Sequence, residues 1–188
     1  MSDFKWCFEA LDPCKVMPLV LELDRNRSPA VYAIYTQSPT VVKYSSGCSP
    51  AIYFGMTRGS EIPINFDKRR FNQTFKGLAW RLALHRANGN LDIFKVPSAG
   101  EEDRIHLGLA YSFLPSAKLA ADWEAALLCA FRHRHAELPL INLTGAKKRE
   151  GYNGLSVLED LTARVSRDQR QIWVPEPDTR WAIIGESG

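Results

Sequence analysis

The chain has 188 residues, of which 45% are hydrophobic and 24% charged, and its formal net charge is +3. This length allows one domain with a full hydrophobic core and excludes two complete domains. The composition is that of an ordinary soluble globular protein. No apolar run approaches the ~20 residues that a membrane-spanning helix needs, so no membrane partner is expected. A net charge this small does not by itself indicate a nucleic-acid partner.

The spacing of the four cysteines indicates the redox environment in which the protein folds. Cys7, Cys14, Cys48 and Cys129 form no Cys-x-x-Cys pair, and no signal-peptide pattern is present. Unpaired cysteines without a secretion signal are typical of a reducing environment. We therefore expect free thiols and a cytoplasmic location.

Residues 1–29 are expected to form an N-terminal helical extension packed on the core. A helix is predicted over Asp3–Leu11, and Val16–Leu23 also has roughly helical apolar spacing. The polar loop Asp24–Pro29 then leads into the first strand.

Two short tyrosine-bearing segments, Ala30–Gln37 and Ala51–Thr57, are predicted to be strands. Both are rich in β-branched and aromatic residues, and Ser, Pro and Gly bound them. Val41–Tyr44 is a candidate prolongation of the hairpin that they form. A third buried strand is predicted over Ile105–Leu114.

Pairing of the first two strands would bring two tyrosines together. Side chains alternate along a strand, so Tyr32 and Ile34 share one face while Tyr35 lies on the other. We therefore expect Tyr32 and Tyr53 to meet and Tyr35 to point elsewhere.

The segment Arg58–Lys76 is long and basic, with three phenylalanines interleaved. Such a mixture suits contact with nucleic-acid bases and backbone. It equally suits a solvated loop that its phenylalanines pin to the core, and the sequence leaves both open. The candidate nucleic-acid contacts are Lys68, Arg69, Arg70, Lys76, Arg86, Lys147 and Lys148.

Two predicted helices carry further candidate site residues. Gly77–Ala87 places Arg81 and His85 at i and i+4, on one face. Ala117–Arg134 has a core-facing apolar stripe with Glu124 close beside it. A carboxylate in that place needs a compensating cation, either a protein side chain such as Arg86 or a metal ion, unless it is exposed to solvent.

The chain after this helix returns to the core and then extends. Asn142 follows Leu138–Ile141, and another amphipathic helix is predicted over Leu155–Arg167. The tail beyond it could close an edge strand or contact a second subunit. The histidines at the end of the longer helix, His133 and His135, are predicted to lie on the surface. With Cys129 they could be drawn as a zinc site, but a fourth ligand with suitable spacing is missing.

The predicted fold is α/β (α+β), with a small central three-stranded antiparallel sheet flanked by helices. The core spans 30–145, and 146–188 forms a C-terminal extension packed on it. Together with the N-terminal extension, these parts are expected to form a single globular domain.

The order of these residues resembles the GIY-YIG nuclease family. Ala30-Val31-Tyr32 stands in the place of the first motif, with Ala for Gly, and Tyr53-Phe54-Gly55 in that of the second, with Phe for Ile. The six positions that match the family's site residues are Tyr32, Tyr53, Arg81, His85, Glu124 and Asn142. The long loops after each tyrosine are similar to those of the family's restriction-endonuclease branch.

The resemblance implies a divalent-metal-dependent endonuclease that hydrolyses DNA. Glu124 would hold Mg²⁺ or Mn²⁺, since Mg²⁺ commonly takes only one or two protein carboxylates. Arg81 would neutralise the scissile phosphate, and Tyr32 or Tyr53 would activate water with help from His85.

A restriction-type enzyme would cut duplex DNA as a homodimer, because one compact domain holds one site and two strands need two. Two other functions stay open. One is a nuclease toxin or defence effector acting on DNA or RNA with low specificity. The other is a catalytically inactive nucleic-acid-binding module.

Overall fold

The computed structural model describes residues 4–11, 28–37, 40–59, 106–142, 145–147, 150–165 and 171–173. The predicted helix Gly77–Ala87, the helical stretch Val16–Leu23 and the basic segment beyond Gly59 lie outside these residues.

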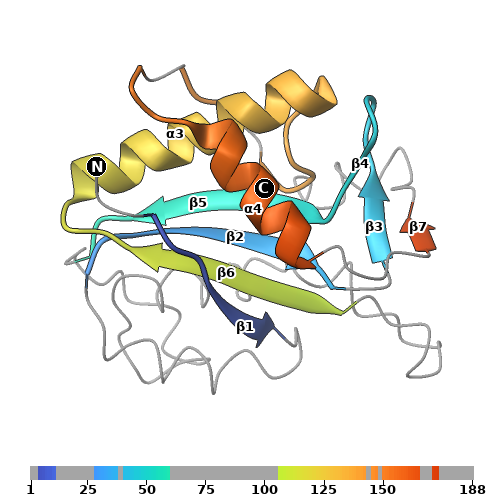
Figure 1. Ribbon diagram of the computed structural model, residues 1–188, viewed down its shortest axis with the longest axis horizontal. Helices are drawn as coiled ribbons and strands as arrows, with labels where there is room; N and C mark the ends of the chain where they lie inside the picture. The colour runs from blue at the N-terminus through green and yellow to red at the C-terminus, as the bar shows by residue number, and fades with distance from the viewer. Residues whose placement is uncertain are drawn as a thin grey trace, which may run out of the picture.

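A four-stranded antiparallel sheet forms the centre of the fold (Figure 1). Its strands, in spatial order, are β1 (Cys7–Leu11), β6 (Leu107–Phe113), β2 (Ala30–Thr36) and β5 (Ala51–Thr57). The three predicted strands are confirmed, but the expected three-stranded sheet is wrong because β1 adds a fourth strand.

The fourth strand replaces most of a predicted helix. The helix predicted over Asp3–Leu11 is wrong for Cys7–Leu11, although Phe4, Phe8 and Leu11 have the i, i+4, i+7 spacing of a helix face. In the structure Cys7 pairs with Tyr111 and Leu11 with Leu107 along β6. Pairing satisfies backbone groups along the otherwise open edge of β6, and this contact with a distant segment overrides the local pattern.

A second, smaller sheet lies beside the first. β3 (Thr40–Lys43) pairs antiparallel with β4 (Cys48–Ser49) and parallel with β7 (Gln171–Trp173). The segment Val41–Tyr44 therefore belongs mainly to this sheet and does not prolong the β2–β5 hairpin. In the C-terminal tail, residues 171–173 supply an edge strand to their own chain.

Two helices, α3 (Ala117–His135) and α4 (Gly154–Val165), cover one face of the main sheet (Figure 1). Both were predicted from sequence and are confirmed to within two residues at each end. The hydroxyl of Ser116 caps α3 by accepting from the Leu119 N–H at 3.2 Å. The helices touch closely at Gly154, where a Cβ atom would lie 2.3 Å from the Ala126 carbonyl oxygen. Neither α3 nor α4 has the length and apolar content that a bilayer crossing requires.

The register of the strands assigns side chains to the two faces. Phe8, Ala110, Ala33 and Phe54 lie opposite one another across the four strands, in one row. The Phe54 ring lies 5.9 Å from that of Phe131 on α3, so this row faces the helices.

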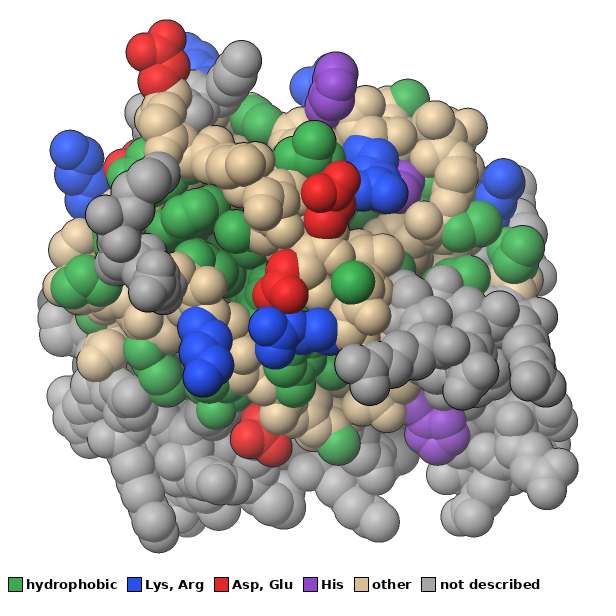
Figure 2. Space-filling view, in the orientation of Figure 1, with side chains coloured by type: hydrophobic (Ala, Val, Ile, Leu, Met, Phe, Trp, Pro, Cys, Tyr) green, Lys and Arg blue, Asp and Glu red, His purple; other side chains and the backbone are tan. Residues whose placement is uncertain are grey.

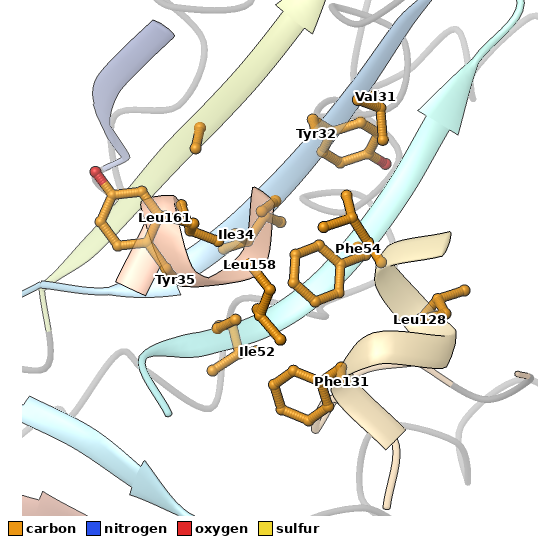
Figure 3. Close-up of a cluster of buried hydrophobic side chains, with 14 of the residues drawn as sticks. Val31, Tyr32, Ile34, Tyr35, Ile52, Phe54, Leu128, Phe131, Leu158 and Leu161 are labelled. Atoms are coloured by element: carbon orange, nitrogen blue, oxygen red, sulfur yellow. The ribbon is translucent and has the colours of Figure 1, made fainter. Parts of the chain in front are cut away.

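The next row comprises Tyr111, Tyr32 and Gly55, which are likewise paired across β6, β2 and β5. Because side chains alternate, this row projects from the opposite face, which we call the tyrosine face. Figure 3 shows the core on the helix side, where Phe131 and Leu128 of α3 and Leu158 of α4 surround Phe54 and Ile52.

Candidate active site

The expected meeting of Tyr32 and Tyr53 is present in the structure. Their ring centroids are 5.7 Å apart, with an angle of 39° between the ring planes. Tyr32 pairs with Gly55 and Tyr53 with Ile34, so the two tyrosines are diagonal neighbours on adjacent antiparallel strands. Diagonal positions on one face are within reach of aromatic side chains. The register of β2 and β5 therefore creates the pair.

Gly55 makes the close approach of the rings feasible. A Cβ atom at this position would lie 2.6 Å from Tyr53 Cε1, 2.8 Å from Tyr32 Cζ and 2.9 Å from the Tyr32 hydroxyl oxygen. All three distances are below van der Waals contact, so both rings occupy space that any larger residue would need. From the sequence, Gly55 was recognised only as part of the Tyr53-Phe54-Gly55 motif. A glycine within a strand of otherwise large side chains could have indicated that neighbouring rings need its space.

The two tyrosines differ in exposure. Tyr32 is fully buried, with 0% of its surface exposed, whereas Tyr53 is only partly buried. Of the two tyrosines, Tyr53 is therefore the one that is accessible to solvent. The buried Tyr32 ring packs against the Tyr53 ring.

Asn142 lies at the outer edge of β5, beside the tyrosine pair. Its Nδ2 donates to the Phe54 carbonyl at 2.7 Å, and its Oδ1 accepts from the Phe54 N–H at 2.8 Å. One residue earlier, the Ile141 N–H donates to the Ile52 carbonyl at 2.9 Å. The segment thus covers the edge of β5 and fixes the backbone between Tyr53 and Gly55.

Glu124 lies on α3, four residues after Ala120 and three before Leu127, both fully buried. Its own side chain is partly exposed. Since α3 packs on the Phe54 side of β5, Glu124 belongs to the helix layer and the tyrosines project from the other face. The edge of β5, the outermost strand of its sheet, separates the two.

Among the described residues, Glu124 is the one residue that was predicted to bind a metal ion. There, no group of three or more His, Cys, Asp or Glu side chains is positioned to hold a metal ion. A single carboxylate is still compatible with Mg²⁺, which keeps several waters and accepts one or two protein carboxylates.

Most of the predicted cationic site residues and nucleic-acid contacts belong to segments outside the described residues. Arg81, His85, Lys68, Arg69, Arg70, Lys76, Arg86 and Lys148 lie outside the described residues. Lys147 is described and exposed. On the helix side, Lys and Arg side chains are interspersed with Asp and Glu (Figure 2), for example in the pair Arg134–Glu159 at 3.4 Å.

Tyr35 projects from the face of the sheet opposite to Tyr32 and Tyr53. The alternation of side chains along β2 predicted this separation. Its ring covers Gly108, where a Cβ atom would lie 2.2 Å from Tyr35 Cζ. Burial raises the pKa of this phenol, a hydrogen bond from the Gln37 side chain lowers it, and the Glu9 charge raises it. Burial dominates, so Tyr35 stays a neutral phenol at physiological pH.

The expectation that His135 lies on the surface is wrong, because only 4% of it is exposed. Its Nδ1 lies 2.9 Å from the Ser46 carbonyl oxygen, and a carbonyl only accepts, so Nδ1 carries the proton. The Cys129 thiol contacts the Ala146 carbonyl at 3.2 Å, and His133 is exposed as expected. Both Cys129 and His135 are thus engaged by backbone carbonyls and not by each other. The described cysteines, Cys7, Cys48 and Cys129, are free thiols.

No protein-family model, no curated protein and no solved structure matches this chain. The function must therefore be argued from the residues and their geometry.

Proposed function

We propose that this chain is a divalent-metal-dependent endonuclease of the GIY-YIG type, which hydrolyses DNA phosphodiester bonds and cuts at specific sites. The observation that carries the proposal is the pairing of Tyr32 with Tyr53, 5.7 Å apart over Gly55 on adjacent strands. A fully buried phenol held against a partly exposed one is a geometry suited to positioning a single reactive hydroxyl.

In this proposal Tyr53 contacts the attacking water, because it is the accessible member of the pair. Tyr32 is a positioning residue that holds the Tyr53 ring. A phenol with an ordinary pKa near 10 is a weak base at neutral pH, so Tyr53 needs cationic neighbours in the assembled site. Arg81 and His85 are the proposed neighbours: Arg81 binds the scissile phosphate and His85 assists proton transfer.

Glu124 is the proposed metal ligand. Its partly exposed carboxylate on a rigid helix suits Mg²⁺ or Mn²⁺. When bound, the ion would supply charge neutralisation at the phosphate and at the leaving oxygen. Because α3 lies on the helix side of β5, the proposal requires Glu124 to act around the edge of that strand, beside Asn142.

The basic segment that follows β5 and Lys147 are proposed to hold the DNA backbone. A homodimer is proposed for duplex cleavage, because one copy of the chain provides one site.

The proposal is tested by incubating supercoiled plasmid with the purified chain and Mg²⁺ or Mn²⁺, with chelator as a blank. We expect discrete, metal-dependent fragments. Tyr53→Phe removes only the hydroxyl and should slow cleavage by roughly 10²- to 10⁴-fold. Glu124→Gln keeps the side-chain shape and should slow it by on the order of 10²-fold or more.

The matched control is Glu159→Gln. Glu159 is an exposed carboxylate on α4 that pairs only loosely with Arg134, at 3.4 Å. This variant should cut at the normal rate. Equal rates for Glu124→Gln and the control would contradict the assignment of the metal ligand.

The pattern of products decides between the remaining functions. A metal-dependent smear would favour a nuclease toxin or defence effector of low specificity. DNA binding without cleavage of DNA or RNA under either metal would refute the enzyme and leave a binding module.

A further inference from the structure

The outer edge of β5 is covered along part of its length. β5 is the last strand of the main sheet, so one of its edges pairs with β2 and the other faces away from it. On this outer edge the Ile52 carbonyl accepts from the Ile141 N–H, and Asn142 bonds both backbone groups of Phe54. Within the described residues, the hydrogen bonds that cover the edge end at Phe54.

The register shows that the Met56 N–H points out of the same edge. Residues of an antiparallel strand alternate between those whose backbone groups bond the neighbouring strand and those whose groups point away from it. Phe54 is of the second kind, because its N–H and carbonyl bond Asn142. Met56 lies two residues further on and pairs with Val31 in an unbroken register, so it has the same orientation. Its N–H and carbonyl are directed away from β2, about 7 Å along the strand from those of Phe54.

The uncovered part of this edge is short. Directly after β5 the Gly59 N–H donates to Thr57 Oγ1 at 3.2 Å, and Gly59 has φ 82°, so the strand ends in a turn. Between the Asn142 contact and this turn, Met56 is the one residue of β5 whose backbone groups point outward. A peptide strand would need a row of such groups. One N–H at the edge of a sheet instead suits a single anionic oxygen.

One proposed catalytic group lies beside this N–H on the tyrosine face. The Tyr53 ring lies over Gly55, the residue before Met56, since a Cβ atom at Gly55 would be 2.6 Å from Tyr53 Cε1. The ring therefore extends along β5 toward Met56.

The proposed metal ligand lies on the other side of the same edge. Glu124 precedes Phe131 by seven residues, or two helical turns, so it shares the stripe of α3 whose Phe131 ring is 5.9 Å from that of Phe54. Seven residues are about 10 Å of helix, which equals about three residues of strand. Because α3 begins at the end of the sheet where β5 ends (Figure 1), Glu124 lies near the level of Met56.

We propose that the backbone N–H of Met56 donates a hydrogen bond to a non-bridging oxygen of the scissile phosphate. The inference rests on the proposed function and names the phosphate contact that joins its two halves: Glu124 on one face of β5 and Tyr53 on the other. The N–H keeps its proton throughout. It stabilises the negative charge on the phosphate oxygen while water adds to phosphorus and the leaving oxygen departs.

The first test compares Met56→Pro with Met56→Ala in the plasmid assay. Proline removes the N–H and is tolerated on an edge strand where that group lies outside the ladder. Alanine is the matched control, because it shortens the side chain and keeps the N–H. We expect kcat of Met56→Pro to be about 10- to 1000-fold below that of Met56→Ala, with KM for DNA within about threefold. Equal kcat values would overturn the inference.

A second variant covers the case in which Met56→Pro does not fold, as judged by circular dichroism. The α-hydroxy acid analogue of methionine, placed at position 56, replaces the N–H by an oxygen and leaves the side chain unchanged. It should lower kcat over the same range, and a kcat equal to that of the unmodified chain would overturn the inference.

Binding is measured apart from catalysis by ¹⁵N NMR titration of the full chain without added metal. The probes are the dinucleotide thymidylyl-3′,5′-thymidine and its uncharged methylphosphonate analogue. We expect a saturable downfield shift of the Met56 amide proton with the phosphodiester and none with the analogue. Absence of this shift up to about 20 mM phosphodiester would overturn the inference, as would an equal shift with the analogue.

The two measurements separate this inference from the proposed function. Plasmid cleavage with equal kcat values for Met56→Pro and Met56→Ala, and without the amide shift, would overturn the inference alone. A saturable amide shift in a chain that cleaves neither DNA nor RNA would overturn the proposed nuclease and retain the phosphate contact.

Discussion

The side-chain amide of Asn142 bonds both backbone groups of Phe54, accepting from its N–H at 2.8 Å and donating to its carbonyl at 2.7 Å. An amide side chain has one acceptor and one donor end, so it substitutes here for a neighbouring strand. Phe54 lies between Tyr53 and Gly55, and the contact therefore fixes the backbone that carries the tyrosine pair.

Asn142→Leu should destabilise the fold. The Phe54 N–H and carbonyl would lose their partners at a partly buried edge, so we expect the free energy of unfolding to fall by about 1–3 kcal/mol. Urea denaturation measures this change. Asn142→Asp retains the acceptor and loses the donor, and should reduce the stability too. An unchanged denaturation midpoint for Asn142→Leu would show that the two bonds contribute nothing.

Gly55→Ala should disturb the tyrosine pair. The added methyl group would lie 2.6 Å from Tyr53 Cε1 and 2.8 Å from Tyr32 Cζ. Overpacking of this kind in a buried strand costs about 1–3 kcal/mol of stability, and any cleavage activity should fall with it.

A matched control for this change is Gly145→Ala, whose methyl group would meet Leu138 Cδ2 at an ordinary 3.4 Å. Its effect on stability should stay within about 0.5 kcal/mol. In a double-mutant cycle, Tyr53→Ala should relieve part of the cost of Gly55→Ala. Strict additivity of the two changes would contradict the clash.

The stability of the fold should depend on the ionisation of His135. Burial lowers the pKa of this imidazole, the hydrogen bond to Ser46 raises it, Arg134 lowers it and Glu137 raises it. The folded chain therefore binds the proton less tightly than the unfolded chain, whose ordinary histidine pKa is about 6.5. The contribution is complete above about pH 6.5 and is lost as the pH falls below that value.

Denaturation at about pH 7.5 and pH 5.5 measures this dependence. His135→Asn keeps an N–H directed at the Ser46 carbonyl but does not titrate, so it should show a smaller loss of stability on acidification. His133→Asn, at an exposed position of the same helix, should retain the loss seen in the unmodified chain. Identical pH dependence for the two variants would refute the role of His135.

Ala136→Gly should stabilise the end of α3. Ala136 has φ 61°, in the left-handed region, where a Cβ atom costs about 1–2 kcal/mol. Glycine removes that cost but increases the freedom of the unfolded chain, so we expect a net gain of about 0.5–1 kcal/mol. Thermal and urea denaturation should both show it. Ala163→Gly, at an exposed position within α4, should instead lower the stability by about 1 kcal/mol. If both substitutions changed the stability in the same direction, the proposed effect of the left-handed conformation at Ala136 would be contradicted.

Several elements could be predicted from sequence because their information is local. Ala30–Thr36, Ala51–Thr57 and Leu107–Phe113 are short, β-branched and aromatic runs bounded by turn residues. Ala117–His135 and Gly154–Val165 have helical periodicity over enough turns to identify them. The alternation of side chains also sufficed to separate Tyr35 from Tyr32.

Other features depend on contacts between segments far apart in the chain. Phe4, Phe8 and Leu11 have the spacing of a helix, yet Cys7–Leu11 is a strand because β6 offers it a hydrogen-bonding edge. His135 is buried because the loop at Ser46 packs over the end of α3. The sequence around the helix terminus contains no information about this contact with a distant loop.

For the site, the sequence by itself determined which residue types lie on which elements, and so proposed Tyr32 with Tyr53. Only the tertiary structure decided that Tyr32 is buried while Tyr53 is accessible, that Gly55 makes room for both rings, and that Asn142 bonds the backbone of Phe54. The reason is physical: strand propensity and periodicity act within a few residues. Exposure, register and hydrogen-bond partners are fixed only when segments as distant as Phe54 and Asn142 meet.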